Sequence, residues 1–232
     1  MRLTAAAAIA LTIFGGAPVQ AQEAPVVVEL YTSQGCSSCP PADELMAELA
    51  GYPDVLPLAL HVDYWDYIGW KDTFGSPQYT KRQQAYAAAS GHRTIYTPQM
   101  IIGGLDHVIG YVPMEVAAAI DKHRKAALPV LLKVKRSGEI VTITAEPHES
   151  LPDVMVVQLV RYLPRAEVAI KRGENEGKTI DYVNVVTEWT VLAKWDGSSA
   201  LTLEAEAKGT DKVAVILQEQ GPGRILTAAV AE

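Results

Sequence analysis

The sequence has few cysteines, no excess of positive charge and, beyond its first residues, no long apolar run. Its 20 Lys and Arg stand against 27 Asp and Glu, which gives a formal net charge of −7, and no Lys/Arg run occurs. This balance excludes the basic surface that nucleic-acid binding requires. Cys36 and Cys39 are the only cysteines, too few for a structural zinc site of about four ligands. Hydrophobic residues make up 49% of the chain, so disorder is excluded and a sizeable core is expected.

The first 21 residues have the pattern of an export signal. A short basic start at Met1 and Arg2 precedes an apolar stretch at 5–14, and residues 19–21 form a small-x-small cleavage site. Because the stretch is too short to cross a bilayer, we predict a cleaved signal peptide over 1–21, with an N-terminal anchor helix as the alternative. We therefore expect a mature protein that is periplasmic or secreted and has no stable membrane insertion.

Residues 22–127 alternate short apolar runs with helical patterns, which is typical of an α/β domain with a parallel sheet. Ser76 followed by Pro77 indicates the start of a helix. Gly103 and Gly104 separate two short strands and predict a tight hairpin. The expected elements are strands at 26–31, 55–62, 99–102 and 107–109 and helices at 43–50, 76–89 and 113–125.

The pattern changes near residue 128 to an alternation of apolar and polar residues, which is typical of half-buried strands. Several short strands at this spacing favour a β-sandwich over residues 128–232. We therefore predict a two-domain protein, α/β first and β-sandwich-like second. The expected strands lie at 141–145, 154–163, 189–195, 201–205, 213–218 and 225–230.

Cys36 and Cys39 form a C-x-x-C motif between the first strand and the first helix. At a helix N-terminus, free N–H groups and the helix dipole stabilise a thiolate. Cys36 is therefore the candidate nucleophile, and Cys39 is the thiol that resolves a mixed disulfide. A purely structural disulfide is the alternative, although it would close only a very small loop.

Thr97 and Pro98 directly precede the strand at 99–102, and a proline at the start of a strand can take the cis form. An ordinary strand-initiating proline is the alternative. The order strand, C-x-x-C, helix, strand, Thr-Pro, hairpin and closing helix resembles a thioredoxin fold. The resemblance implies that Pro98 is a cis-proline packed against the Cys36–Cys39 pair, and that the backbone of Thr97 binds the substrate chain.

Glu29 lies near the end of the first strand and matches, with a shift of one residue, the buried acid of thioredoxins. The resemblance implies that Glu29 accepts the proton of Cys39 if burial raises its pKa. A side chain that reaches solvent at the strand end is the alternative. Gly35 stands where thioredoxins usually have tryptophan, and Ser37-Ser38 lacks proline and histidine, so the direction of electron flow stays open.

Longer segments resemble a secreted bacterial family catalogued as domain of unknown function 1223. They are ELYTSQGCSSCPPAD (29–43), HVDYWDYIGW (61–70), RQQAY (82–86), YTPQMIIGG (96–104) and GENEGKTIDYVNVV (173–186). The match spans nearly the whole chain that follows the export signal. It implies a thioredoxin-like domain over 22–127, with a helical insertion at about 64–96, followed by a β-rich domain over 128–232.

The insertion begins with an aromatic cluster at the end of the second strand, where α/β proteins build their sites. Tyr64 and Trp65, with Tyr67 and Trp70 nearby, are the candidate substrate-binding side chains. Such a cluster suits a peptide or an apolar ligand. Packing of these rings into the core of the insertion is the alternative.

We expect an exported thiol–disulfide oxidoreductase that uses a redox-active Cys36–Cys39 disulfide and no further cofactor. Its partners would be thiols or disulfides of exported proteins and an unidentified redox partner. A copper chaperone is the first alternative, since two thiolates and a histidine, His61 or His107, suit Cu(I). A redox-inert binding module is the second, and a charged glycine loop around Asn175 belongs to it, although such a loop is usually a solvated turn.

Overall fold

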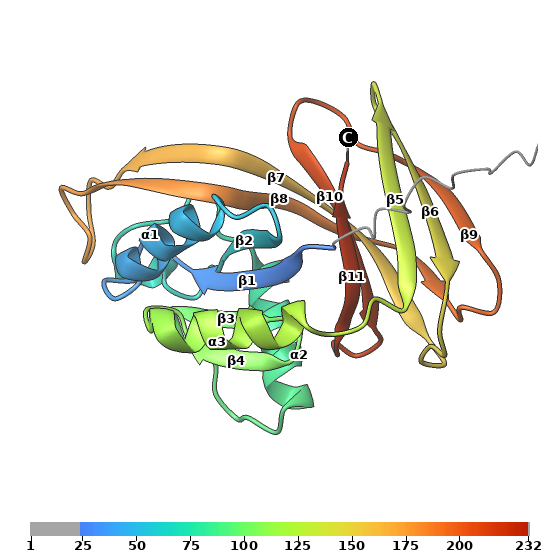
Figure 1. Cartoon of the computed structure of the whole chain (residues 1–232). Helices are drawn as coiled ribbons and strands as arrows, with labels where there is room; N and C mark the ends of the chain where they lie inside the picture. The colour runs from blue at the N-terminus through green and yellow to red at the C-terminus, as the bar shows by residue number, and fades with distance from the viewer. Residues whose placement is uncertain (1–23, 232) are drawn as a thin grey trace, which may run out of the picture.

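Eleven strands and three α-helices form the described part of the chain, residues 24–231, in the computed structural model (Figure 1). The predicted export signal at 1–21 lies outside the described residues. The helices are α1 (Pro40–Leu49), α2 (Pro77–Ala89) and α3 (Pro113–Arg124), with a short 3₁₀ helix η1 (Asp66–Ile68). The strands are β1 (Val26–Thr32), β2 (Val55–His61), β3 (Gln99–Ile102), β4 (Asp106–Ile109), β5 (Val130–Ser137), β6 (Ile140–Pro147), β7 (Met155–Ala169), β8 (Thr179–Trp195), β9 (Leu201–Glu206), β10 (Lys212–Glu219) and β11 (Ile225–Val230). None of the described helices has the length and apolar character needed to span a membrane.

An eight-stranded sheet runs through the molecule in the order β11-β10-β7-β8-β2-β1-β3-β4. β1 pairs in parallel with β2, while β3 and β4 follow antiparallel on its other side. β8 joins the two halves of the sheet, because it pairs in parallel with β2 at Ala59 and Val185. Strands from both sides of residue 128 therefore share one sheet, and the predicted mixed α/β fold is confirmed.

Helices cover both faces of β1, and every residue of that strand is buried. Even-numbered residues of β1, such as Leu30, pack with Met46 of α1 and Ile120 of α3 in one apolar cluster. Odd-numbered residues, such as Tyr31, pack with Tyr86 of α2 in another. Because side chains alternate along a strand, the two helical layers lie on opposite faces of the sheet.

Each α-helix begins with a proline, whose fixed φ and missing N–H suit the first helical position. These residues are Pro40, Pro77 and Pro113. At α2, Ser76 Oγ also accepts a hydrogen bond from the backbone N–H of Gln78 (3.2 Å), as expected for an N-cap. α1 starts at Pro40, earlier than predicted, for the same reason.

β5, β6 and β9 form a second sheet that packs against β7, β10 and β11. Val130, Leu132 and Val134 of β5 are buried in this interface, whereas Lys133 and Lys135 are exposed. β5 is absent from the predicted strands, although it has the same alternation of apolar and polar residues that identified the others.

β7 and β8 are far longer than predicted, with 15 and 17 residues. Their outer halves form a hairpin that runs beside β2 and past α1 (Figure 1). The outer residues are mostly exposed or half-buried, so their sequence lacks the apolar period of the other strands. The hairpin carries its turn, residues 170–178, to the loop that follows β1.

A buried ion pair joins β1 to α2. Glu29 is fully buried, and its carboxylate accepts hydrogen bonds from Arg82 Nε (2.7 Å) and Nη2 (2.8 Å). The hydroxyls of Tyr31 and Tyr86 donate to the same carboxylate. Four hydrogen bonds thus satisfy a carboxylate that has no contact with solvent.

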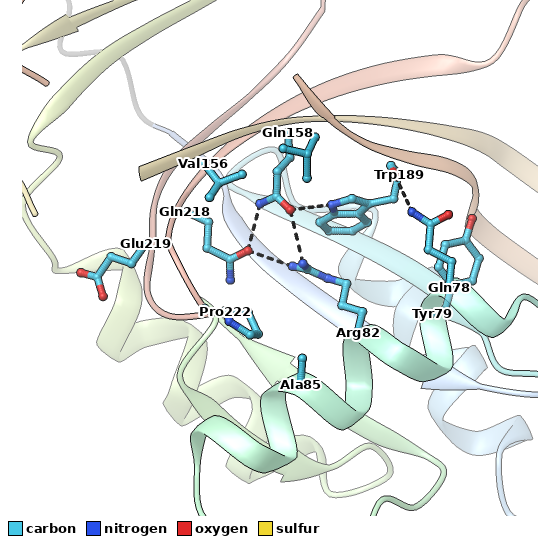
Figure 2. A pocket seen from close by; sticks show the side chains of 12 residues that line it. Gln78, Tyr79, Arg82, Ala85, Val156, Gln158, Trp189, Gln218, Glu219 and Pro222 are labelled. Carbon is cyan, nitrogen blue, oxygen red and sulfur yellow. Dashed lines mark hydrogen bonds between the residues drawn. The ribbon is translucent and has the colours of Figure 1, made fainter. Parts of the chain in front are cut away.

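The same guanidinium reaches the C-terminal strands. Arg82 donates to Gln158 of β7 and Gln218 of β10, and it lies over the ring of Trp189 of β8 at 3.9 Å (Figure 2). A cavity of about 320 Å³ lies beside Arg82, between α2 and these strands. The ion pair therefore ties β1 and α2 to three strands of the C-terminal part.

Replacing Glu29 by Gln removes the negative charge and leaves the Arg82 guanidinium buried without its counter-ion. Breaking a buried pair in this way should lower the free energy of unfolding by roughly 3–5 kcal/mol, measured by urea denaturation. Arg165→Gln is the matched control, because its ion pair with Asp181 is exposed and should contribute almost nothing. A loss for Glu29→Gln as small as that of the control would contradict the role of the pair.

Candidate active site

The Cys36–Cys39 disulfide lies between β1 and α1, at the predicted helix N-terminus. Cys39 is the N-cap of α1 and is fully buried, whereas Cys36 is 4% exposed. Ser37 and Ser38, between the two cysteines, are exposed. Of the two cysteines, only Cys36 therefore has any exposed surface.

The Thr97–Pro98 peptide bond is cis, which confirms the predicted conformation. Pro98 is buried, and its carbonyl oxygen accepts a hydrogen bond from the backbone N–H of Gly110 (3.1 Å). A Cβ atom on Gly110 would lie 3.2 Å from Pro98 Cβ and 3.1 Å from Ala42 Cβ. The Thr-Pro turn therefore packs, with only a glycine between, against the helix that carries the cysteine pair.

Trp65 connects the Thr-Pro turn with the cysteine loop. Its indole Nε1 donates to Thr97 Oγ1 (2.8 Å), and its Cβ would lie 3.3 Å from a Cβ atom on Gly35. The exposed ring of Tyr67 stacks on Trp65, with 6.3 Å between ring centroids. Two predicted substrate-binding residues, Trp65 and Thr97, thus lie together beside the cysteine loop. The third, Tyr64, lies with them, because its ring centroid is 5.6 Å from that of Trp65, and its hydroxyl donates to Gln83 Oε1 of α2 (3.3 Å).

Gln34 anchors the cysteine loop and has no exposed surface. Its backbone N–H donates to Asp72 Oδ2 (2.8 Å). Its side-chain oxygen accepts from the Trp70 indole (2.8 Å), and its side-chain amide donates to Thr73 Oγ1 (3.0 Å). These bonds fix the backbone that leads into Cys36. Gln34 was not predicted as a site residue, because its position close to Cys36 is the only sequence feature that links it to the cysteine motif.

Asn175, in the turn of the β7–β8 hairpin, reaches the same loop. Its side-chain amide donates to the carbonyl oxygens of Gln34 (3.0 Å) and Cys36 (2.8 Å), and the residue is 1% exposed. Lys178 Nζ donates to the Asn175 side-chain oxygen (2.8 Å). Asn175 is therefore not part of a solvated turn, as such a loop usually is. It holds the backbone of the cysteine loop, although it lies 139 positions from Cys36 in the sequence.

A buried histidine and two buried aspartates lie next to this loop. His61 Nδ1 and Asp72 Oδ2 are 2.8 Å apart, and neither side chain is exposed. Burial alone would raise the pKa of Asp72, but His61 and two backbone N–H groups hold this pKa below its usual value. Burial raises the pKa of Asp43, one turn into α1, to about 7. Neither aspartate was predicted as a site residue, because a single acid in a helix or a loop has no distinctive sequence pattern.

Comparison with known proteins places these residues within one family. The family model described as Protein of unknown function (DUF1223) matches residues 27–218. The chain belongs to the DUF1223 family. It is also similar to the crystal structure of a structural genomics target from Agrobacterium tumefaciens, with 35% sequence identity and a TM-score of 0.77 over 90% of this chain and 95% of that one. A comparison with curated proteins gave no match.

Glu29 does not reach the cysteines in this DUF1223 chain. It shares the face of β1 that carries Tyr31 and pairs with Arg82, whereas α1 packs on the opposite face. The predicted role as proton acceptor for Cys39 is therefore replaced by a structural ion pair. The alternative of a side chain in solvent is wrong as well, because Glu29 is fully buried.

The two histidines considered as copper ligands have other partners in the DUF1223 chain. His61 directs Nδ1 to Asp72 (2.8 Å), and His107 Nε2 lies 3.1 Å from Ser90 Oγ. Across residues 24–231, no three His, Cys, Asp or Glu side chains are grouped so that they could hold a metal ion.

Replacing Asn175 by Ala leaves the carbonyl oxygens of Gln34 and Cys36 buried without this donor. The loss should lower the free energy of unfolding by roughly 1–3 kcal/mol and speed amide hydrogen exchange in residues 33–39. Exchange followed by mass spectrometry measures the second effect. Glu176→Ala, an exposed change in the same turn, is the control. Equal exchange in the two variants would show that the turn does not hold the loop.

Asp43 should make the protein less stable as the pH rises. Its pKa is about 7 in the folded chain, against about 3.9 when unfolded, so only the folded state holds the proton between these values. By pH 8, ionising the buried carboxyl costs on the order of 4 kcal/mol.

Asp43→Asn removes this titration. Its stability relative to the wild type should therefore be higher at pH 8 than at pH 4.5, as measured by urea denaturation at both pH values. Glu48→Gln, at an exposed position farther along α1, should show no such difference. The same relative stability of Asp43→Asn at both pH values would contradict the raised pKa.

Proposed function

We propose that the chain is a thioredoxin-like thiol–disulfide oxidoreductase that acts on exported proteins through Cys36 and Cys39. The observation that carries the proposal is the disulfide at the N-terminus of α1, with the Thr97–Pro98 turn packed against the same helix. The free N–H groups of a helix N-terminus stabilise the thiolate that exchange requires.

Accessibility determines which sulfur reacts first. A substrate thiolate attacks Cys36 Sγ, because Cys39 is fully buried. The Cys36–Cys39 bond breaks, its electron pair goes to Cys39 Sγ, and the substrate sulfur forms a mixed disulfide with Cys36. A second substrate thiol then displaces Cys36, which leaves an oxidised substrate and two reduced cysteines. Run in reverse, the same steps reduce a substrate disulfide, and the cysteine pair is itself the redox group.

The arrangement of the first half supports a thioredoxin-like unit. β1 and β2 are parallel, β3 and β4 are antiparallel, α1 and α3 lie on one face and α2 lies on the other. The second sheet packed on β7, β10 and β11 supports a β-sandwich in the other half. Trp65 fills the space beside Gly35, where thioredoxins have a tryptophan of their own.

Aromatic rings beside the cysteine loop support a polypeptide substrate. Tyr67 is 78% exposed and stacks on Trp65, which in turn bonds to Thr97. Such exposed rings next to a polar turn suit an extended, partly apolar chain. Together with the predicted export signal, they favour unfolded exported proteins as substrates.

Equilibration in glutathione and dithiothreitol buffers of known potential tests the proposal. The pair should open and close reversibly, with free thiols counted by alkylation and mass spectrometry. A midpoint near about −120 to −200 mV would indicate an oxidant or isomerase, and one near about −270 mV a reductant. A pair that stays closed, or stays open, in every buffer would refute exchange.

Single cysteine variants separate the two sulfurs. Cys36→Ser should abolish exchange, because no accessible sulfur is left. Cys39→Ser should accumulate a mixed disulfide with glutathione or with a reduced, unfolded protein, because the resolving thiol is gone. Ser37→Ala, an exposed change between the cysteines, is the control and should exchange normally. Failure of Cys39→Ser to form a mixed disulfide would count against the assigned order of attack.

A further inference from the structure

Five polar side-chain atoms at the base of the cysteine loop are buried, and none of them has a hydrogen-bond partner among residues 24–231. Unpaired buried polar atoms are rare and costly, so a group of them requires a physical explanation. They come from β1, α1, β2 and β8. The atoms are Thr32 Oγ1, Asp43 Oδ1 and Oδ2, His61 Nε2 and Tyr182 OH.

These atoms belong to one continuous cluster. Thr32 and His61 are neighbours in the β1–β2 register. The rings of His61 and Tyr182 meet edge to face, with 4.8 Å between centroids. Asp43 interacts electrostatically with both His61 and Tyr182. The unpaired imidazole nitrogen and the carboxyl group of Asp43 therefore lie in one buried cluster.

The cluster is connected to the cysteines from two sides. Asp43 follows Cys39 by four residues, which places both side chains on one side of the first helical turn. Its backbone N–H also donates to the Cys39 carbonyl oxygen (3.2 Å). On the other side, Asp72 Oδ2 binds His61 Nδ1 and the backbone N–H of Gln34, each at 2.8 Å.

We infer that Asp43, backed by His61, gives a proton to Cys39 when the disulfide opens and takes it back when the disulfide closes. The inference rests on the proposed exchange reaction. On opening, the electron pair of the broken bond goes to Cys39 Sγ, which takes the Asp43 proton and leaves a thiol and a carboxylate. On closing, the carboxylate removes that proton, and the thiolate attacks the mixed disulfide at Cys36 and releases the bound thiolate.

The electrostatic surroundings suit an exchangeable proton. Burial raises the pKa of Asp43 to about 7, and His61 opposes this effect. The other groups that interact with Asp43 are the Thr32 hydroxyl, Asp72, Glu44 on α1 and the Tyr182 hydroxyl, whose own pKa burial raises. No fixed cation is among these interacting groups, so the carboxyl can be protonated near neutral pH.

The closing step provides the test. Reduced protein is mixed with oxidised glutathione at pH values from 5 to 9, and the release of glutathione from the Cys36 mixed disulfide is followed. Wild-type protein should show an inflection near pH 7. Asp43→Asn should lose the inflection and close roughly 100-fold more slowly at pH 7. Glu48→Gln, an exposed change farther along the same helix, should behave as the wild type.

Three results separate the possible failures. If the wild-type pair does not react with glutathione at all, both the proposed function and this inference fall. If it reacts and Asp43→Asn keeps the wild-type pH profile, only the inference is overturned. If Asp43→Asn does not fold, the titration of the Asp43 carboxyl in the wild-type protein is measured instead by ¹³C NMR, in the oxidised and the reduced state. Titration of Asp43 near pH 7 that shifts between oxidised and reduced protein supports the role, and titration below pH 5 in both states overturns it.

Discussion

One buried charge couples the N-terminal layers to the C-terminal strands. Arg82 enters the interior on α2, where an unpaired guanidinium would cost several kcal/mol. Glu29 neutralises it from β1, and Gln158 of β7 and Gln218 of β10 accept further hydrogen bonds from it. Trp189 covers its face from β8. Arg82 contacts all these groups at once only in one placement of α2. The position of α2 is therefore fixed relative to both halves of the large sheet.

That position determines how the cysteine loop is supported. β8 carries Trp189 next to Arg82 and pairs with β2 at Val185, so its outer half is directed along β2. The hairpin turn then reaches the loop that follows β1, where Asn175 binds two carbonyl oxygens. The cysteine loop is thus held both by α1, which follows it in the sequence, and by the distant turn of the β7–β8 hairpin. A C-x-x-C motif is short and local, yet its backbone here depends on the order of the whole sheet.

The sequence predicted what local rules control and missed what distant contacts control. Pro77 and Ser76 marked a helix start, and Gly103 with Gly104 marked a hairpin, because backbone geometry restricts residue choice at those points. β5 had the right alternation and was overlooked. The outer half of the β7–β8 hairpin carried no apolar period to find, since much of it is exposed. The role of Asn175 has no local signal, because its partners lie about 140 residues away.

The two buried acids, Glu29 and Asp43, also show what a local sequence pattern cannot predict. Side chains alternate along β1, so Glu29 points to the α2 layer, and no local pattern says which layer holds the cysteines. Asp43 points to the cysteine side because it lies one helical turn after Cys39. The neighbours of the two acids then separate their tasks. Glu29 faces a guanidinium and serves as its counter-ion, whereas Asp43 faces a histidine and two hydroxyl groups and can exchange a proton. In one fold, the environment rather than the residue type decides which carboxyl group holds the structure together and which is available for chemistry.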